Sequence, residues 1–243
     1  MDAHDKIKPS VRKEDIKAGL MRLGLKKGDM VGVHSSLSSF GHVEGGADTV
    51  IEALLETVGE RGSVVMSTHS ANLSEDKRTS EMIALGISWL FKILPYDPDK
   101  TRVTTGIIPE TFRKEKGVVR GLHPSLSIAA SGPKAEILSE GWHRLLELDG
   151  FILLIGVGLD RCTAMHLAEK RVHVFPDRIL KKITPPKWFV EKYSEEEWEW
   201  DIGPYPDFAK LTQPCIKRVI MKTMHAYLCV SSLLTTSSKG TNE

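Results

Sequence analysis

The sequence predicts an α/β protein with a single three-layer α/β/α domain around a largely parallel central sheet. Helical and strand-like patterns alternate over residues 16–68, the order that places helices on both faces of a parallel sheet. The segment FILLIGV at 151–157 is apolar throughout and has the length of a buried central strand. No internal repeat and no low-complexity linker precedes the C-terminal tail, so one domain is the simplest arrangement of the 243 residues.

The alternation of helices and strands is clearest in the first quarter of the chain. Residues 16–25 carry apolar side chains at helical spacing, and residues 30–34 form a short apolar run typical of a strand. Residues 45–59 predict a second amphipathic helix with Gly59 as its C-terminal stop. The segment GSVVMST at 62–68 then predicts the next buried strand.

The remaining elements follow from the same patterns. Residues 80–94 predict a helix that ends at Pro95, and residues 107–117 predict a short helix. A strand is expected over 125–130, and a helix over 162–171 after the central strand.

Composition and charge limit the classes of partner and the compartment that we expect for this protein. With 33 basic and 32 acidic residues the formal net charge is +1, so overall charge gives no reason to expect a nucleic acid or an anionic membrane as partner. No secretory signal and no membrane-spanning apolar run are visible, which predicts a cytoplasmic protein. The three cysteines, Cys162, Cys215 and Cys229, are widely spaced and fit reduced thiols better than disulfides or a metal site. A homodimer is the one assembly that we keep open.

The segment GLHPSLSIAASG at 121–132 places a histidine at a stiff corner of the backbone. Gly121 and Pro124 flank His123 and restrict its conformation. Two interpretations are open: His123 caps a strand, or it is a proton-transfer group held in one orientation.

The segment VHSSLSSFGHVEGG at 33–46 leads from a strand through a serine-rich loop into a helix. A helix N-terminus attracts phosphate, and small residues allow a ligand to approach the backbone closely. Neither GxxxxGK[ST] nor GxGxxG is present, so a structural loop remains the alternative to a phosphate site.

A third candidate is CTAMHLAEK, in which His166 and Glu169 share one face of the expected helix. A carboxylate there would stabilise a protonated imidazole, although a surface i,i+3 pair is the alternative. HExxH, CxxC and GxSxG are absent, which gives no support for zinc or for a serine nucleophile. The tryptophans of EEEWEW are expected to be packing residues.

Taken in order, these motifs resemble the aminoglycoside N3-acetyltransferase family, whose fold is distinct from the GNAT fold. The resemblance runs through VHSSLSSFGHVEGGADTVIEALLETVG, GSVVMST, TTGIIPETFRKEKGVVRGLHPSLSIAASGPKA and LLELDGFILLIGVGLDRCTAMHLAE, and more weakly EWDIGPYPDFAKL. It implies acetyl-CoA as donor, an amine of an aminoglycoside on the 2-deoxystreptamine ring as acceptor, and no metal. It also implies that His123 is the catalytic base and that Glu169 belongs to the same site. The residues implied to line the CoA site are His34, Ser35, Ser36, Leu37, Ser39, Ser67, Thr68 and Thr105.

The chain departs from the family pattern at two places. The family carries a longer segment before Trp142, and beyond about residue 212 this sequence does not match it. We therefore expect an acetyltransferase-like domain over 1–212 and a divergent, partly disordered tail over 213–243. Two alternatives to the transferase are open: a relative that binds CoA without acceptor turnover, and a metal-assisted hydrolase using His123, His166 and Glu169. Acidic residues are expected in the acceptor cleft, the candidates being Glu44, Asp76, Glu81, Asp97, Asp99, Glu110 and Glu169.

Overall fold

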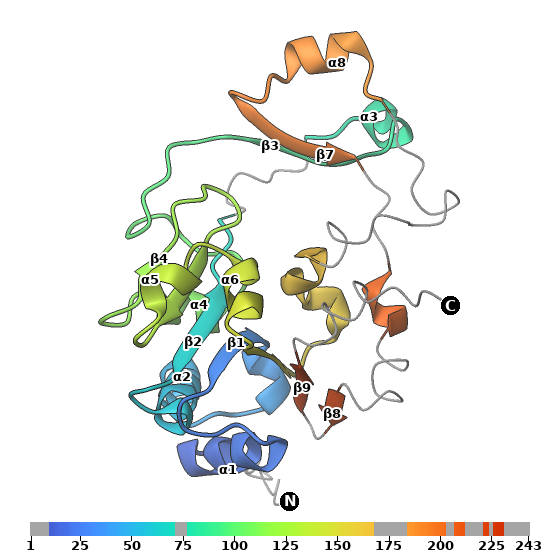
Figure 1. Ribbon diagram of the computed structural model, residues 1–243. Coiled ribbons are helices and arrows are strands. Elements are labelled where there is room, and N and C mark those ends of the chain that lie inside the picture. The colour runs from blue at the N-terminus through green and yellow to red at the C-terminus, as the bar shows by residue number, and fades with distance from the viewer. Residues whose placement is uncertain are drawn as a thin grey trace, which may run out of the picture.

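A seven-stranded mixed sheet forms the centre of the computed structural model (Figure 1). The structure describes residues 10–70, 77–167, 184–202, 207–211, 221–223 and 226–230. The strands of the main sheet lie in the order β4-β5-β2-β1-β6-β9-β8. Their bounds are β1 (Met30–Ser35), β2 (Ser63–Ser67), β4 (Val119–Arg120), β5 (Ile128–Ser131), β6 (Phe151–Ile155), β8 (Met221–Thr223) and β9 (Ala226–Val230).

The three central strands run parallel. β1 pairs in parallel with β2 on one side and with β6 on the other. Each flank begins with an antiparallel strand, β5 or β9, and ends with a strand antiparallel to that one, β4 or β8. β4 and β8 therefore run in the same direction as the central strands. The carboxyl ends of β1, β2 and β6 consequently meet at one edge of the sheet.

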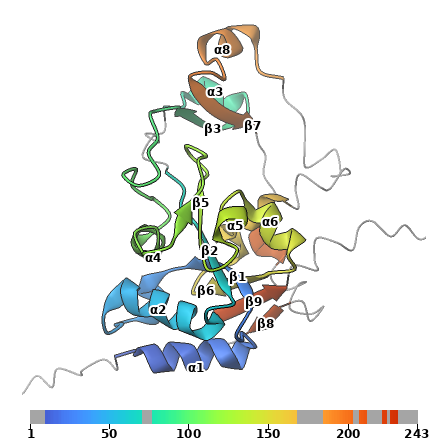
Figure 2. The ribbon, with the colours of Figure 1, turned by 60° about the vertical axis from the view of Figure 1, so that its left-hand side comes forward.

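Helices cover both faces of this sheet (Figure 2). Successive side chains of a strand point to opposite faces, and β2 shows this directly: Val64 and Met66 pack in one buried cluster, whereas Val65 packs in the other. The first cluster includes the apolar sides of α1, α2 and α4, and the second includes α5 and α6. The bounds of these helices are α1 (Lys13–Leu23), α2 (Gly46–Val58), α4 (Ile107–Phe112), α5 (Ala135–Leu138) and α6 (Trp142–Glu147).

The predicted fold class is confirmed, and so are the first four elements. α1, β1, α2 and β2 fall where the periodicity places them. α2 ends at Val58 and is followed by Gly59 at φ 64°, a positive φ that glycine adopts without steric cost. In the described ranges, no helix has both the length and the apolar character needed to cross a bilayer.

The predicted helix over 80–94 is wrong beyond its first turns. Helix α3 (Ser80–Ala84) is short, Gly86 follows at φ 84°, and the chain continues as strand β3 (Ile87–Lys92). β3 pairs antiparallel with β7 (Trp198–Ile202), which is distant in sequence. The apolar run suits either a helix or a strand, and pairing with β7 decides between them.

Two further segments differ from the predictions. The strand expected over 125–130 begins at Ile128, because residues 124–126 form a turn. The helix expected over 162–171 begins as 3₁₀ turns at Leu159–Arg161 and Thr163–Met165, and residues 168–171 lie outside the described part. Most of the expected disordered tail also lies outside it, including residues 231–243. Within that tail, β9 pairs with β6 along its whole length.

A small second sheet, β3–β7, carries its own aromatic cluster at some distance from α1 (Figures 1 and 2). Helix α8 (Lys187–Lys192) packs against this sheet through Phe189, which is fully buried. The ring of Phe189 contacts those of Tyr193 and Trp200, and Tyr193 also contacts Trp198. The interpretation of the EEEWEW tryptophans as packing residues is therefore confirmed.

Candidate active site

Most of the candidate residues that the structure describes lie near the carboxyl ends of β1 and β2. In open α/β sheets this edge is where ligands bind. β1 delivers His34 and Ser35 to the edge, and β2 delivers Ser67 followed by Thr68. The hairpin between β4 and β5 brings His123 to the end of β2, because the backbone amides of Thr68 and Ser70 donate to carbonyls of that hairpin.

His34 is buried at the end of β1, with a fractional exposure of 5%. Its ring lies 5.0 Å from that of Trp142, centroid to centroid, and its Nε2 has no hydrogen-bond partner among the described residues. Burial, with a smaller contribution from His69, lowers the pKa of His34 to about 3. His34 therefore stays neutral at pH 7 and binds a proton too weakly to serve as a base there.

A chain of hydroxyl groups connects β2 with the segment after β6. Ser67 Oγ and Thr163 Oγ1 are 2.7 Å apart, and the indole N–H of Trp142 donates to Thr163 Oγ1 at 3.1 Å. Trp142, which follows the shortened segment, thus closes against His34 on one side and Thr163 on the other. These bonds hold α6, β2 and the loop after β6 together around the strand ends.

The serine-rich loop after β1 turns tightly over the end of β6. Ser36 N–H donates to the carbonyl of Ile155 at 3.0 Å, and Ser39 Oγ donates to the Ser36 carbonyl at 2.6 Å. A Cβ on Gly156 would lie 1.6 Å from Ser39 Oγ, so only glycine fits at that position. Leu37 packs against the core beneath the loop. Ser35 Oγ is buried without a partner in the described residues.

His123 is exposed at the tip of the β4–β5 hairpin, and its backbone is tightly held. A Cβ on Gly121 would lie 2.3 Å from the Ser139 carbonyl oxygen, and Tyr96 donates its hydroxyl to the Gly121 carbonyl at 2.8 Å. His123 Nδ1 accepts backbone N–H bonds from Ser125 at 3.3 Å and Leu126 at 3.0 Å. The ring is therefore fixed by the backbone that follows it, and in this arrangement the neutral form carries its proton on Nε2.

Arg120, at the base of this hairpin, connects it by hydrogen bonds to the segment after β2 and to residues 98–101. Its side chain is buried, at 8% residue exposure, and donates to the carbonyls of Thr68, Pro98 and Thr101. It also donates to the hydroxyls of Ser70 and Ser127, and its guanidinium lies 5.2 Å from the centroid of the Tyr96 ring. Burial lowers the pKa of Arg120. Sequence reasoning missed this residue, since only the fold brings its partners together.

His69 is a second residue that sequence reasoning missed. It directly follows Thr68 beyond β2, and its carbonyl accepts from both the amide and the hydroxyl of Thr104. Burial, and then the nearby imidazoles of His123 and His166, lower the pKa of His69 to about 4. Four histidines, His34, His69, His123 and His166, therefore gather at this edge. In the ranges described, no group of three or more His, Cys, Asp or Glu side chains could hold a metal ion.

The other predicted site residues have mixed surroundings. Thr68 is fully buried, and its hydroxyl lies 3.2 Å from that of Ser127. Thr105 donates its hydroxyl to the Ser67 carbonyl at 2.6 Å. His166 is exposed, and its ring contacts that of Phe208 edge-on at 5.5 Å. Glu169 lies outside the described residues.

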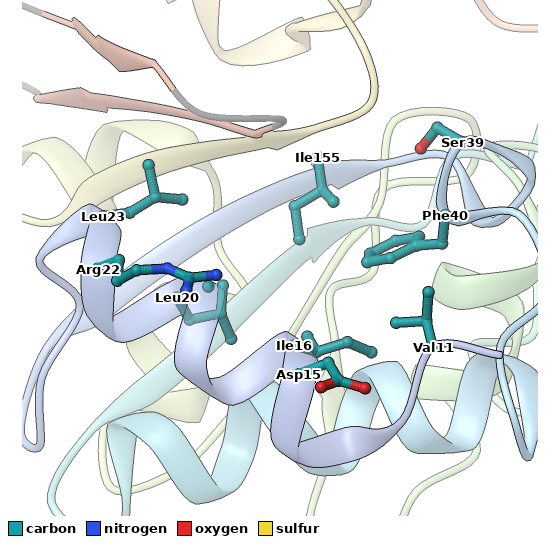
Figure 3. A pocket seen from close by; sticks show the side chains of 10 residues that line it. Val11, Asp15, Ile16, Leu20, Arg22, Leu23, Ser39, Phe40 and Ile155 are labelled. Carbon is teal, nitrogen blue, oxygen red and sulfur yellow. The ribbon is translucent and has the colours of Figure 1, made fainter. Parts of the chain in front are cut away.

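A separate pocket of about 310 Å³ lies on the α1 side of the sheet (Figure 3). Side chains of α1 form one wall, and Ser39, Phe40 and Ile155 line the other parts. Of the predicted CoA-binding residues it includes only Ser39, and no histidine lines it. It therefore borders, through Ser39 and Ile155, the edge at which the candidate residues gather, and lies mainly against α1. Its lining residues are Val11, Asp15, Ile16, Gly19, Leu20, Arg22, Leu23, Ser39, Phe40 and Ile155.

Two curated relatives match about two thirds of the chain. YokD of Bacillus subtilis (strain 168), an SPbeta prophage-derived aminoglycoside N(3′)-acetyltransferase-like protein, is 37% identical over 177 residues, 66% of this chain and 65% of YokD. Aminoglycoside N(3)-acetyltransferase IX of Micromonospora chalcea is 33% identical over 188 residues, 70% of this chain and 66% of that protein. The chain thus spans slightly less than two thirds of the length of either relative.

Solved structures share the fold. The apoenzyme of aminoglycoside acetyltransferase AAC(3)-IVa superposes with a TM-score of 0.72 at 24% identity, covering 95% of this chain and 88% of that one. AAC-IIIb, solved as a binary complex with CoASH, gives a TM-score of 0.68 at 23% identity and covers 93% and 94%. The family model described as aminoglycoside 3-N-acetyltransferase matches residues 33–226, which include the end of β1, the serine-rich loop and the His123 corner. The chain belongs to the aminoglycoside 3-N-acetyltransferase family.

Proposed function

We propose that the protein transfers the acetyl group of acetyl-CoA to the 3-amino group of the 2-deoxystreptamine ring of an aminoglycoside. The observation that carries the proposal is the position of His123, an exposed imidazole held at the edge where β1, β2 and β6 end, in a chain of this family. The reaction needs a proton acceptor beside a thioester, and a strand-end loop beside an imidazole suits it.

The donor would bind along the serine-rich loop after β1. Two buried atoms of consecutive residues at the end of β1, His34 Nε2 and Ser35 Oγ, lack hydrogen-bond partners within the described residues. Buried polar atoms are normally paired, so a ligand that reaches this edge could supply the missing bonds. The segment 35–39 carries four serines, and α2 begins just beyond at Gly46. CoA fits this set because its pantetheine arm carries amide groups and its phosphates suit a helix N-terminus.

The chemistry proposed is direct transfer within a ternary complex. The neutral amine nitrogen attacks the thioester carbonyl carbon, the C–S bond breaks, and CoA leaves as the thiol. His123 accepts the proton that the amine loses and returns it to the departing sulfur. No covalent acyl-enzyme is needed, which agrees with the absence of a GxSxG elbow.

The imidazole must release its backbone contacts to act in this way. In the free protein Nδ1 accepts from two amides, one of them at 3.3 Å, which is a weak contact. Catalytic hydrogen bonds in free enzymes are often not yet aligned and tighten only in the substrate complex. We propose that the ring turns when acceptor binds, and that Glu169 then orients it and stabilises its protonated form.

The test is thiol release from acetyl-CoA by the purified protein, in the presence of kanamycin, gentamicin and neomycin in turn. Release that depends on the aminoglycoside, with one acetyl group added at the 3-amino position, supports the proposal. CoA binding without acceptor-dependent release would contradict it and identify a CoA-binding relative that has lost turnover. Activity that survives dialysis against a chelator would count against the metal-assisted hydrolase.

A further inference from the structure

Strand β7 brings a carboxylate to the His123 corner. Glu199, on β7, accepts a hydrogen bond from the Ser125 hydroxyl, and the backbone amide of the same Ser125 donates to His123 Nδ1 at 3.3 Å. One residue thus contacts both the imidazole and the carboxylate. We propose that Glu199 binds an ammonium group of the acceptor beside the amine that reacts. The inference rests on the proposed function, because it concerns the acceptor of that reaction.

The fold explains why Glu199 points to this corner. Side chains of a strand alternate between its two faces, and Trp198 and Trp200 join the aromatic cluster with Phe189 and Tyr193. Glu199 stands between the two tryptophans and is left on the other face of β7. Figure 2 shows the loop above β5 extending toward the β3–β7 sheet. The alternation of tryptophan and glutamate therefore gives β7 two different faces. The tryptophans on one face pack in the aromatic cluster, and Glu199 on the other face reaches the His123 corner.

Glu199 also differs in charge environment from acidic residues nearby. Glu110 is largely buried and is neutralised by Arg113 at 2.8 Å and Lys114 at 2.7 Å. Asp97 pairs with Lys100 at 3.2 Å. Within the described part of the chain, no lysine or arginine forms an ion pair with Glu199, which is half-buried. Its negative charge is therefore available to a cation at the corner.

The chemistry favours a neighbouring ammonium group over the reacting amine itself. The reacting nitrogen must lose its proton before it attacks, and a carboxylate in direct contact would stabilise the protonated form. Aminoglycosides carry several other amines that stay protonated at pH 7. A carboxylate held by Ser125 can bind one of these through a charge-assisted hydrogen bond. The reacting amine is then placed against the imidazole on the other side of Ser125.

The experiment compares Glu199→Gln with a matched control, Glu197→Gln, which changes an exposed glutamate two residues earlier. Calorimetry measures the binding of kanamycin, and separately of CoA, to the unmodified protein and to each variant. We expect Glu199→Gln to weaken kanamycin binding by about 10- to 100-fold, the effect of losing one hydrogen bond to a charged group. CoA affinity should be unchanged in both variants, which shows that the fold is intact. Glu197→Gln should bind kanamycin like the unmodified protein.

The outcomes separate this inference from the proposed function. Kanamycin binding that depends on Glu199, without thiol release in the transfer assay, would refute the proposed function and leave the inference standing. Equal kanamycin affinity in the two variants, or no kanamycin binding by the unmodified protein, would overturn the inference. If Glu199→Gln fails to fold, Ser125→Ala replaces it: this change releases the carboxylate from its position and should weaken kanamycin binding while CoA affinity is retained. Unchanged kanamycin affinity in Ser125→Ala would then contradict the inference.

Discussion

The two histidines that the site brings to neighbouring strand ends are held in opposite ways. His34 is buried against Trp142, has no hydrogen-bond partner at Nε2 in the described residues, and has its pKa lowered to about 3. His123 is exposed at a hairpin tip, and its Nδ1 accepts two backbone amides. The imidazole at the end of β1 is thus enclosed by the protein, whereas the imidazole at the corner is open to solvent.

The two environments suit different halves of the proposed reaction. A buried imidazole that stays neutral contributes shape and a hydrogen-bonding atom but does not exchange protons near pH 7. An exposed imidazole on a rigid turn can meet a substrate amine and take its proton. We therefore propose that the donor binds at the end of β1 and that proton transfer occurs at the corner.

The largest expected effect comes from removing the imidazole at the corner. His123→Ala should lower kcat by about 10²–10⁴-fold, the usual contribution of a positioned proton acceptor. Steady-state kinetics with acetyl-CoA and kanamycin measure kcat. His166→Ala is the control: wild-type kcat in His123→Ala beside an inactive His166→Ala would move the chemistry to the other histidine.

The next effect concerns the arginine beneath the corner. Arg120→Met would leave the carbonyls of Thr68, Pro98 and Thr101 without their donor, and should lower the free energy of unfolding by about 3–5 kcal/mol. Urea denaturation at pH 7 measures the change. Arg161→Met, at an exposed arginine whose ion pair within the described residues is with its neighbour Asp160, should stay within about 0.5 kcal/mol. A loss below about 1 kcal/mol in Arg120→Met would show that the network does not hold the corner.

A smaller effect should appear in the pH dependence of stability. The unfolded chain binds a proton at His34 near pH 6.5, whereas the folded chain does so only near pH 3, so stability is lost as the pH falls through this window. Between pH 7 and pH 5 this contribution amounts to about 2 kcal/mol. His69, whose pKa is lowered to about 4, acts in the same direction. His34→Phe keeps a ring against Trp142 and should remove only the His34 part.

Urea titrations of the unmodified protein and His34→Phe at the two pH values provide the measurement. The free energy of unfolding of His34→Phe should decrease by about 2 kcal/mol less than that of the unmodified protein. The same decrease in both proteins would show that His34 is not a buried neutral histidine, and the comparison of the two sides would lose its basis.

Local patterns in the sequence predict the early part of the fold well. α1, β1, α2 and β2 have clear periodicities and glycine stops, so their positions follow from neighbouring residues alone. Residues 80–94 do not, because their apolar side chains suit two structures and only the distant partner β7 selects the strand. The boundary expected at residue 212 stays a prediction.

The candidate site is predictable to a similar extent. His123 and the serine-rich loop are visible because glycine, proline and serine at fixed spacing are themselves local signals. Arg120, His69 and Glu199 are not, because their importance arises only from partners that the fold brings close. The roles of the predicted site residues, Glu169 included, remain proposals.

The most direct test of the proposal that donor binding and proton transfer occur at different places is a calorimetric titration of two variants with CoA. Ser36→Tyr places a ring in the loop proposed to bind the donor, and His123→Ala removes the imidazole from the corner. The account predicts that Ser36→Tyr loses at least about tenfold in CoA affinity, equivalent to about 1.4 kcal/mol, while His123→Ala binds CoA like the unmodified protein. Unchanged CoA affinity in Ser36→Tyr, together with a large loss in His123→Ala, would contradict it.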